Sequence, residues 1–263
     1  MSDAEAALLG LVQGLTEFLP VSSDGHLVIA ERLLGVSEKG MVFVIAVHVA
    51  TLVSVLLFYR ERVSELVRGV LTLRPEALRY AGKLVVATLP AVVAAVTIGD
   101  FLESQFESTR AAAIGLLITG AVLWTTRHTY ASARFDAPSW STAFWMGWAQ
   151  AIAILPGVSR SGLTLAAALA LGVAPVAAAE FSFLMSIAAI AGAAVWALPE
   201  LLAAPPGHMA VLGIGAAVAL VSGIGAIWFC LRLLRRGSLH WFAYYTWAAG
   251  LATLAWLHLH GGA

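Results

Sequence analysis

Two short polar stretches, Pro20-Val-Ser-Ser-Asp-Gly25 and Pro156-Gly-Val-Ser-Arg-Ser-Gly162, interrupt apolar parts of the chain. They divide the apolar regions of about 5–35 and 142–172 into halves. Each half is too short to cross a bilayer, because a spanning helix needs roughly 17–25 mostly apolar residues. Non-helical backbone at membrane depth is tolerated only where protein or a water-filled cavity surrounds it. We therefore predict two re-entrant helix hairpins, each with a polar tip.

The composition of the whole chain supports a membrane protein. Of the 263 residues, 60% are hydrophobic and 11% are charged, whereas a soluble domain has about 45–50% apolar and about 25% charged residues. This excess also excludes a disordered chain. The formal net charge of zero leaves no basic surplus for binding nucleic acid. The single cysteine, Cys230, excludes an internal disulfide.

Six further stretches approach the length of a spanning helix. They lie at about 40–59, 83–99, 111–127, 174–197, 209–231 and 240–257. The loops after the first, third and fifth stretches hold 11 of the 15 Lys and Arg residues. The opposite loops, about 100–110 and 198–208, carry only Arg110. Because cytoplasmic loops are enriched in Lys and Arg, we place the three basic loops in the cytoplasm and both termini outside.

The two broken regions match each other at an offset of 137 residues. The matching positions are Gly10 with Gly147, Gln13 with Gln150, Val21-Ser22 with Val158-Ser159, and Gly25 with Gly162. Three spans follow each break, and an odd number turns the second copy upside down. The sequence thus predicts an all-α integral membrane protein with a single membrane domain, 1–263. Its two inverted-topology repeats, 5–128 and 142–258, each contain a re-entrant hairpin plus three transmembrane helices, with a site at their interface.

The first tip gathers ionisable groups, which are expensive inside a bilayer and therefore functional candidates. They are Glu17, Asp24 and His26. Gln13 lies four residues before Glu17, on the same helix face, and such oxygen ligands suit Mg²⁺ or Ca²⁺. Ser23 and His26 are three residues apart and would meet if a helix starts there. The structural alternatives are an interfacial carboxylate, a helix cap at Asp24 and a core histidine.

The second tip carries chemistry suited to phosphate. Arg160 stands between Ser159 and Ser161, with Thr164 one turn later. Arginine grips phosphate with two parallel hydrogen bonds, and a helix N-terminus adds backbone N–H donors. If the tips meet, a phosphate would lie between Arg160 and this helix end on one side and Ser23 and His26 on the other, with Ser22 as a further phosphate-binding residue. The structural alternative is an arginine that extends to the membrane surface.

Two other ionisable residues lie inside predicted spans. His48 is in the first span and Glu180 is in the fourth. The sequence assigns neither a role, and each is explained equally well as a group that pairs with a neighbouring helix.

The stretch Gln13-Gly-Leu-Thr-Glu17-Phe-Leu-Pro-Val-Ser-Ser-Asp-Gly-His26 resembles the first signature of the bacitracin-resistance family of undecaprenyl-pyrophosphate phosphatases. The stretch 156–162 resembles the second, and the resemblance extends through Glu180-Phe-Ser-Phe-Leu-Met. It covers essentially the whole chain. It implies a membrane phosphatase that converts undecaprenyl diphosphate to the monophosphate carrier of cell-wall synthesis, and a role in bacitracin resistance.

The resemblance also implies roles for matching positions. Gln13 and Glu17 fill the metal-associated pair, Ser23 and His26 the nucleophilic pair, and Arg160 the pyrophosphate-binding position, with Ser159, Ser161 and Thr164 beside it. One departure is Asp24, where the family pattern has Ser or Thr. The extra carboxylate beside a phosphate site is partly offset by Gln13, which replaces a glutamate.

These expectations combine into a mechanistic hypothesis. Ser23 attacks the terminal phosphoryl group and His26 acts as general base. Arg160, the helix N-terminus and the divalent cation stabilise the developing charge. The competing version is direct attack by a water that His26 activates. The protein would lie in the plasma membrane as a multi-pass protein, with a site open to the outer face.

Two other classes of function remain open at this point. Inverted repeats with broken helices are also typical of transporters, so a polyprenyl-phosphate flippase or an ion-coupled transporter is the main alternative. A structural membrane scaffold is the third. A homodimer is one assembly compatible with the sequence, which does not decide the oligomeric state.

Overall fold

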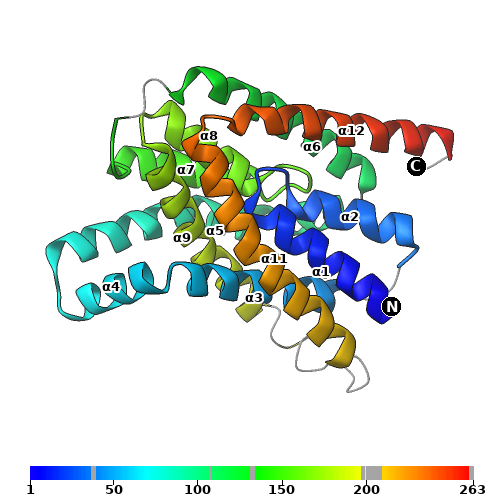
Figure 1. Ribbon diagram of the computed structural model, residues 1–263, viewed down its shortest axis with the longest axis horizontal. Coiled ribbons are helices and arrows are strands. Elements are labelled where there is room, and N and C mark those ends of the chain that lie inside the picture. The colour runs from blue at the N-terminus through cyan, green and yellow to red at the C-terminus, as the bar shows by residue number, and fades with distance from the viewer. Residues whose placement is uncertain (37–39, 107, 131–133, 197–198, 200–208, 261–263) are drawn as a thin grey trace.

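The computed structural model describes residues 1–36, 40–106, 108–130, 134–196, 199 and 209–260, and these residues form an all-helical protein without a named strand (Figure 1). The helices are α1 (Asp3–Phe18), α2 (Ser23–Leu34), α3 (Gly40–Phe58), α4 (Arg60–Leu71), α5 (Pro75–Phe106), α6 (Thr109–Thr125), α7 (Trp140–Ile152), α8 (Arg160–Ala170), α9 (Pro175–Trp196), α11 (Met209–Arg235) and α12 (Phe242–Leu259). The all-α fold expected from the sequence is confirmed.

Both predicted breaks separate pairs of short helices. α1 ends at the first tip, where Leu19 is extended, and α2 begins behind the N-cap Ser22. α8 begins behind the N-cap Ser159. Each cap serine accepts a hydrogen bond from a glycine N–H three residues later, Gly25 at 3.3 Å and Gly162 at 3.0 Å. A capped helix start in place of a continuing helix explains why the chain turns at both stretches.

Within the described part of the chain, four helices are long and apolar enough to cross a membrane, and they match four predicted spans. They are Pro75–Leu102, Thr109–His128, Pro175–Trp196 and Met209–Arg235. The span expected at 83–99 belongs to a longer helix, α5, which contains Pro90 and has non-helical backbone at Ile98. The expected outer loop 198–208 lies outside the described residues, apart from Pro199.

The other two predicted spans differ from expectation. The stretch 40–59 is the first arm of a pair, Val42–Phe58 and Arg60–Leu71, bent by 80°. It counts as a fifth span only when the two arms are taken together. The stretch 240–257 does form α12, but this helix is not among the described helices that are apolar enough to span. Its tyrosine, tryptophan and histidine side chains lower its mean hydropathy.

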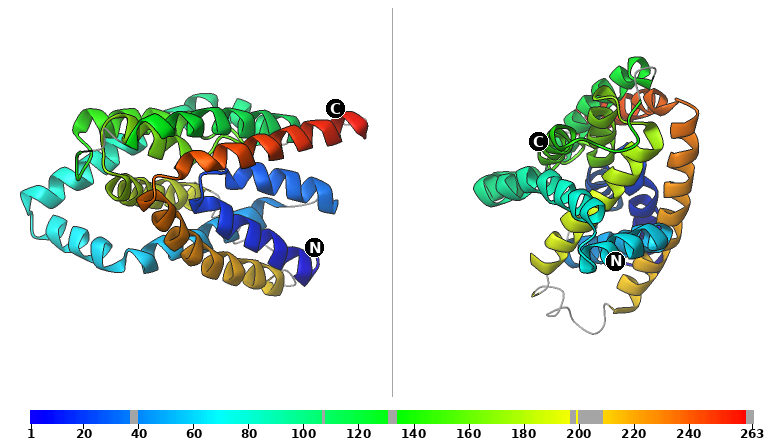
Figure 2. Two further views of the ribbon diagram at one scale, coloured as in Figure 1. Left: turned by 45° about the horizontal axis from the view of Figure 1, so that its top comes forward. Right: turned by 90° about the vertical axis from the view of Figure 1, so that its left-hand side faces the viewer.

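The first helix of each predicted repeat, 5–128 and 142–258, packs against a helix of the other half of the chain. α1 runs beside α11, and α7 runs beside α5 (Figures 1 and 2). The approach is close because small residues face the partner: a Cβ added to Gly14 would meet the Gly223 nitrogen at 2.9 Å. A Cβ added to Gly147 would meet the Ala87 oxygen at 2.7 Å. Glycine at such positions lets helix backbones touch inside a membrane protein, so the two halves are interleaved.

Candidate active site

The two polar tips meet through their backbones. A Cβ added to Gly25 would meet the Cα of Gly157 at 2.6 Å, so both positions must be free of a side chain. Gly157 also has a φ of 84°, a conformation that L side chains rarely adopt. Ser161 Oγ donates to the Leu19 carbonyl at 3.1 Å and ties the second tip to the first. The two tips therefore meet, which is the condition for a site that both of them share.

Thr119 of α6 holds the second tip in place. Its hydroxyl donates to the Gly157 carbonyl and accepts from the Ser159 N–H, both at 2.8 Å. Thr119 is fully buried, so this pair of bonds satisfies backbone groups that no helix serves. Sequence reasoning missed this residue, whose only signal was a hydroxyl within an apolar span.

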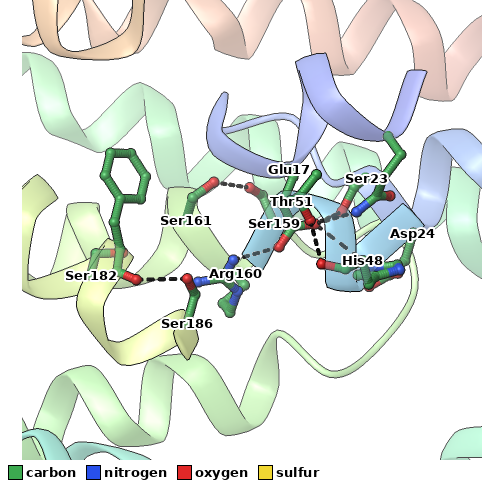
Figure 3. Close-up of polar contacts among 12 residues, drawn as sticks. Glu17, Ser23, Asp24, His48, Thr51, Ser159, Arg160, Ser161, Ser182 and Ser186 are labelled. Carbon is green, nitrogen blue, oxygen red and sulfur yellow. Dashed lines mark hydrogen bonds and ion pairs between the residues drawn. The ribbon is translucent and has the colours of Figure 1, made fainter. Parts of the chain in front are cut away.

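Glu17 is the centre of the site (Figure 3). Its Oε1 accepts from Arg160 Nη2 at 2.6 Å. Its Oε2 accepts from Ser23 Oγ at 2.5 Å and from Gln13 Nε2 at 3.0 Å. Glu17 is only 6% exposed, so these donors compensate the carboxylate for its lost hydration. One carboxylate thus joins the hydroxyl of the first hairpin to the guanidinium of the second.

Arg160 is the first residue of α8 and keeps binding capacity. Its Nη1 is buried and has no hydrogen-bond partner among the described residues, so part of the guanidinium's donor capacity is unsatisfied. Ser159 and Ser161 lie beside it, with their hydroxyls 3.3 Å apart. The helix N-terminus behind Ser159 adds a positive dipole end. These groups lie together at the tip where the sequence predicts a phosphate site.

Thr164 does not join this cluster. Its hydroxyl contacts Ser182 Oγ of α9 at 2.6 Å and donates to the Arg160 carbonyl at 2.8 Å. It is not among the described residues that line the cavity at the tips. The structure therefore does not bring Thr164 together with the Ser159 and Ser161 hydroxyls, because its own hydroxyl bonds to the Arg160 carbonyl and to α9 instead.

His26 does not meet Ser23, contrary to expectation. Its Nδ1 lies 2.7 Å from the Ser22 carbonyl, and its Nε2 lies 2.8 Å from the hydroxyl of Tyr245 on α12. The two rings are stacked at an interplanar angle of 6°. Neither contact of His26 reaches Ser23, whose hydroxyl bonds to Glu17 of α1. His26, three residues on, contacts α12 instead.

The imidazole that lies at the site belongs to His48 of α3. Its Nε2 lies 3.3 Å from Asp24 Oδ1 and 3.7 Å from Glu17 Oε2. Its Nδ1 lies 2.7 Å from the Val44 carbonyl, which fixes the proton on that nitrogen and turns Nε2 toward the carboxylates. The unusual carboxylate of Asp24 therefore has an imidazole partner. The sequence contained both residues but no spacing that joined them.

Glu180 has a structural partner away from the site. Arg62 Nε donates to Glu180 Oε1 at 2.9 Å, and the Tyr80 hydroxyl donates to the same oxygen at 3.3 Å. The Arg62 guanidinium also lies 4.8 Å from the centroid of the Tyr80 ring. These contacts tie the bend after α3 to α5 and α9.

A cavity of about 800 Å³ opens at the tips. Its polar end is lined by Glu17, Ser22, Ser23, Asp24, His48, Gln150, Ser159, Arg160 and Ser161. Its remaining walls are mostly apolar and come from α2, α3, α5 and α9. Within the described ranges, there is no group of three His, Cys, Asp or Glu residues arranged to hold a metal ion. The site therefore offers a carboxylate, a hydroxyl, a guanidinium and a helix N-terminus at the end of an apolar chamber.

Comparison with known proteins identifies the family that carries this site. Residues 6–252 match the family model described as bacitracin resistance protein BacA. The chain belongs to this family. The match covers both hairpins and the helices between them, so the contacts described above come from family positions.

Curated relatives of the BacA family align over nearly their full length. A protein of Carboxydothermus hydrogenoformans named undecaprenyl-diphosphatase is 38% identical over 259 residues, 97% of each chain. One of Salinibacter ruber with the same name is 42% identical over 262 residues, 94% of this chain and 96% of its own. One of Aliivibrio salmonicida, again of that name, is 37% identical over 267 residues, 98% of this chain and 100% of its own.

Proposed function

We propose that this protein is a membrane phosphatase that hydrolyses undecaprenyl diphosphate to the monophosphate and inorganic phosphate. The observation that carries the proposal is the sharing of one buried carboxylate, Glu17, between Ser23 and Arg160 inside the cavity. A nucleophilic hydroxyl and an anion-binding guanidinium then face the same point. The relatives are named undecaprenyl-diphosphatase, which supports hydrolysis over the flippase or transporter alternative.

Ser23 is the nucleophile in this proposal. Its oxygen forms a bond to the terminal phosphorus while the bond from that phosphorus to the bridging oxygen breaks, and the lipid monophosphate leaves. The hydroxyl proton passes to Glu17, whose Oε2 already accepts from Ser23 Oγ. Water then attacks the phosphoserine and releases inorganic phosphate. Direct attack by water on the diphosphate is the competing version.

Arg160 and the start of α8 bind the phosphates. The free Nη1 and the adjacent Ser159 and Ser161 hydroxyls supply donors for phosphate oxygens. Negative charge develops on those oxygens during phosphoryl transfer. The donors are already in position to stabilise this charge, and sites of this kind lower the barrier in that way.

Glu17 and Gln13 would hold a divalent cation, Mg²⁺ or Ca²⁺. Gln13 is fully buried, and its Oε1 has no partner in the described part of the chain, so it is a free oxygen ligand. Mg²⁺ commonly takes one or two protein carboxylates and completes its shell with water and substrate phosphates, which fits this small donor set. When bound, the cation would screen the phosphates from the Glu17 carboxylate.

The two halves form inverted repeats in the plasma membrane, with the site open to the outer face. Support for the repeat comes from helix starts: α2 and α8 begin at Ser23 and Arg160, 137 residues apart. Support for the orientation comes from the ends of the molecule. The start of α1 and the end of α12 lie at the right of Figure 1, and the arginine-rich α4 lies at the left. The cavity is lined by the C-terminal halves of α5 and α9, which the charge pattern directs outward.

Phosphate release by the purified protein tests the proposal. The assay uses undecaprenyl diphosphate in detergent micelles, with Mg²⁺ or Ca²⁺ and with EDTA, for the unaltered protein and for Glu17→Ala and Arg160→Ala. Metal-dependent release that both variants lose is the expected result. Micelles hold no ion gradient, so release there separates an enzyme from a transporter. A folded sample that releases no phosphate with either metal contradicts the proposal.

A further inference from the structure

The cavity continues beyond its polar end as an apolar chamber between α5 and α9. On α5 the lining residues Ala91 and Ala95 lie four residues apart and share one helix face, and Gly99 lines the cavity just after the non-helical backbone at Ile98. On α9 the small lining residues are Ala189, Ala193 and Ala194, with the larger Ile190 among them. We call the six small residues the α5–α9 wall. Small residues thus line the chamber from both helices.

Rows of small residues commonly allow two helices to pack closely, but these rows do not serve that purpose. Ala95 and Ala193 remain exposed. A Cβ added to Gly99 would meet no heavy atom of the described structure within 4 Å. The outward side of α5 carries large exposed residues instead, Val92 and Val96 among them. The small side chains therefore keep volume open on the cavity side only.

The polar end of the same cavity presents buried groups that need a partner. Gln150 is 3% exposed and lines the cavity, and its Oε1 accepts no hydrogen bond from any described residue. Arg160 Nη1 is likewise without a described partner. A site with unpaired polar groups at one end and apolar walls at the other fits an amphiphile with a compact polar head and a slender apolar chain.

We propose that the α5–α9 wall binds the part of the isoprenyl chain next to the diphosphate, and that a long chain passes Gly99 on its way to the bilayer. The proposal rests on the proposed function, because the diphosphate at Arg160 sets where the chain begins. Gly99 follows Ala91 by eight residues along α5, on the far side of the non-helical backbone at Ile98. A short chain ends before this point, whereas a long chain must pass it.

The test places a large side chain at Gly99 and compares two substrates. A Cβ at Gly99 meets no heavy atom of the described structure within 4 Å, and leucine favours helix over glycine, so the substitution adds bulk at this point of the cavity lining. Gly213→Leu on α11 is the matched control: a Cβ there also meets no described atom within 4 Å, and Gly213 is not among the described residues that line the cavity. The substrates are undecaprenyl diphosphate and the shortest isoprenyl diphosphate that the unaltered protein hydrolyses.

Gly99→Leu is expected to lower the ratio of kcat/KM for the long substrate to that for the short one by about tenfold or more, the discrimination that apolar bulk gives in a binding pocket. Gly213→Leu leaves the ratio unchanged. Ala193→Leu on the facing helix repeats the experiment from the other side and is expected to give the same shift.

Three outcomes overturn the proposal or its basis, and they are distinguishable. An unchanged ratio in both cavity variants shows that the chain does not pass between α5 and α9. An equal loss on both substrates, with a change of oligomeric state, indicates that the wall is a contact between copies of the chain. No phosphate release from either substrate by the unaltered protein contradicts the proposed function itself.

Discussion

The two hairpins share one frame and differ in the side chains that the frame presents. At the offset of 137 residues, Ser22 corresponds to Ser159 and both cap a helix. The next residue is Ser23 in one hairpin and Arg160 in the other, and each contacts one oxygen of the same carboxylate. Glu17 itself corresponds to Ile154, which carries no charge. Equivalent backbone positions therefore deliver a hydroxyl and a guanidinium to a single acid.

The comparison teaches that asymmetry, not symmetry, makes the site. Two copies of the first hairpin would place two carboxylates together and repel a phosphate. Two copies of the second would leave a guanidinium without an acid. The predictions below test how far each hairpin depends on the residue that the other one lacks.

Removing the hydroxyl of the first hairpin is expected to have the largest effect. Ser23→Ala deletes the proposed nucleophile, and kcat for phosphate release should fall by about 10³-fold or more. Ser186→Ala is the control, because this buried α9 serine donates to its own helix at Phe183 and is not among the described cavity residues. Full activity of Ser23→Ala would remove the phosphoserine route and leave direct attack by water.

Removing the guanidinium of the second hairpin is expected to have the next largest effect. Arg160→Ala should lower kcat/KM by about 10²–10³-fold, the size seen when a donor to developing charge is lost. It also leaves Glu17 buried without its cation, which should destabilise the fold by about 3–5 kcal/mol. Arg160→Lys keeps a charge but not the planar fork, so it should retain part of the activity.

A double variant separates these two effects. Glu17→Gln with Arg160→Gln removes both charges, so thermal unfolding in micelles should return toward the temperature of the unaltered protein. Activity should stay lost. Recovered activity in the double variant would mean that the pair serves folding rather than the reaction.

The tip glycines should differ in their tolerance of a methyl group. Gly25→Ala would place a Cβ 2.6 Å from the Gly157 Cα, which is backbone and cannot move alone. Gly162→Ala would place a Cβ 3.0 Å from the Ser159 Cβ, which is a side chain. We expect Gly25→Ala to lower the free energy of unfolding by about 1–3 kcal/mol and Gly162→Ala to cost less. Equal melting temperatures for the two variants would show that the tips do not cross as described.

Removing either of the two imidazoles of the first half is expected to have the smallest effect on activity. His48→Ala removes the ring beside Asp24 and Glu17, and kcat/KM should fall about tenfold, the size of one lost hydrogen bond to a charged partner. For His26→Ala, kcat/KM should fall less, because the His26 ring contacts Tyr245 and the Ser22 carbonyl. The reverse order would support His26 as the general base and require its contact with Tyr245 to break during the reaction.

The sequence predicted the hairpins well because their signals are local. Serines at the caps and prolines at the breaks dictate where a helix stops and starts, whatever lies around them. Glu17, Ser23 and Arg160 were found because polar groups inside apolar segments are rare. The resemblance to the family signature pointed to the same three residues.

The sequence did not predict which side chains meet across the fold. Spacing within one helix put Ser23 beside His26, but tertiary packing turned them toward different helices. The contact of His48 with Asp24 depends on how α3 lies against α2, and nothing in local periodicity encodes that. The bend after α3 was not predicted for the same reason. The ion pair at this bend joins Arg62 to Glu180, and these two residues lie far apart in the sequence.

The interleaving of α1 with α11 has a consequence for how the protein is made. Gly10 and Gly14 lie against residues 209–235, which leave the ribosome only after most of the chain has entered the membrane. Glu17, at the end of α1, has no guanidinium beside it until Arg160 has been synthesised. The N-terminal helix is therefore the first to be inserted and among the last to find its final neighbours. During that interval the Glu17 carboxylate lacks its counter-charge, so the order of biosynthesis runs opposite to the order in which the site is completed.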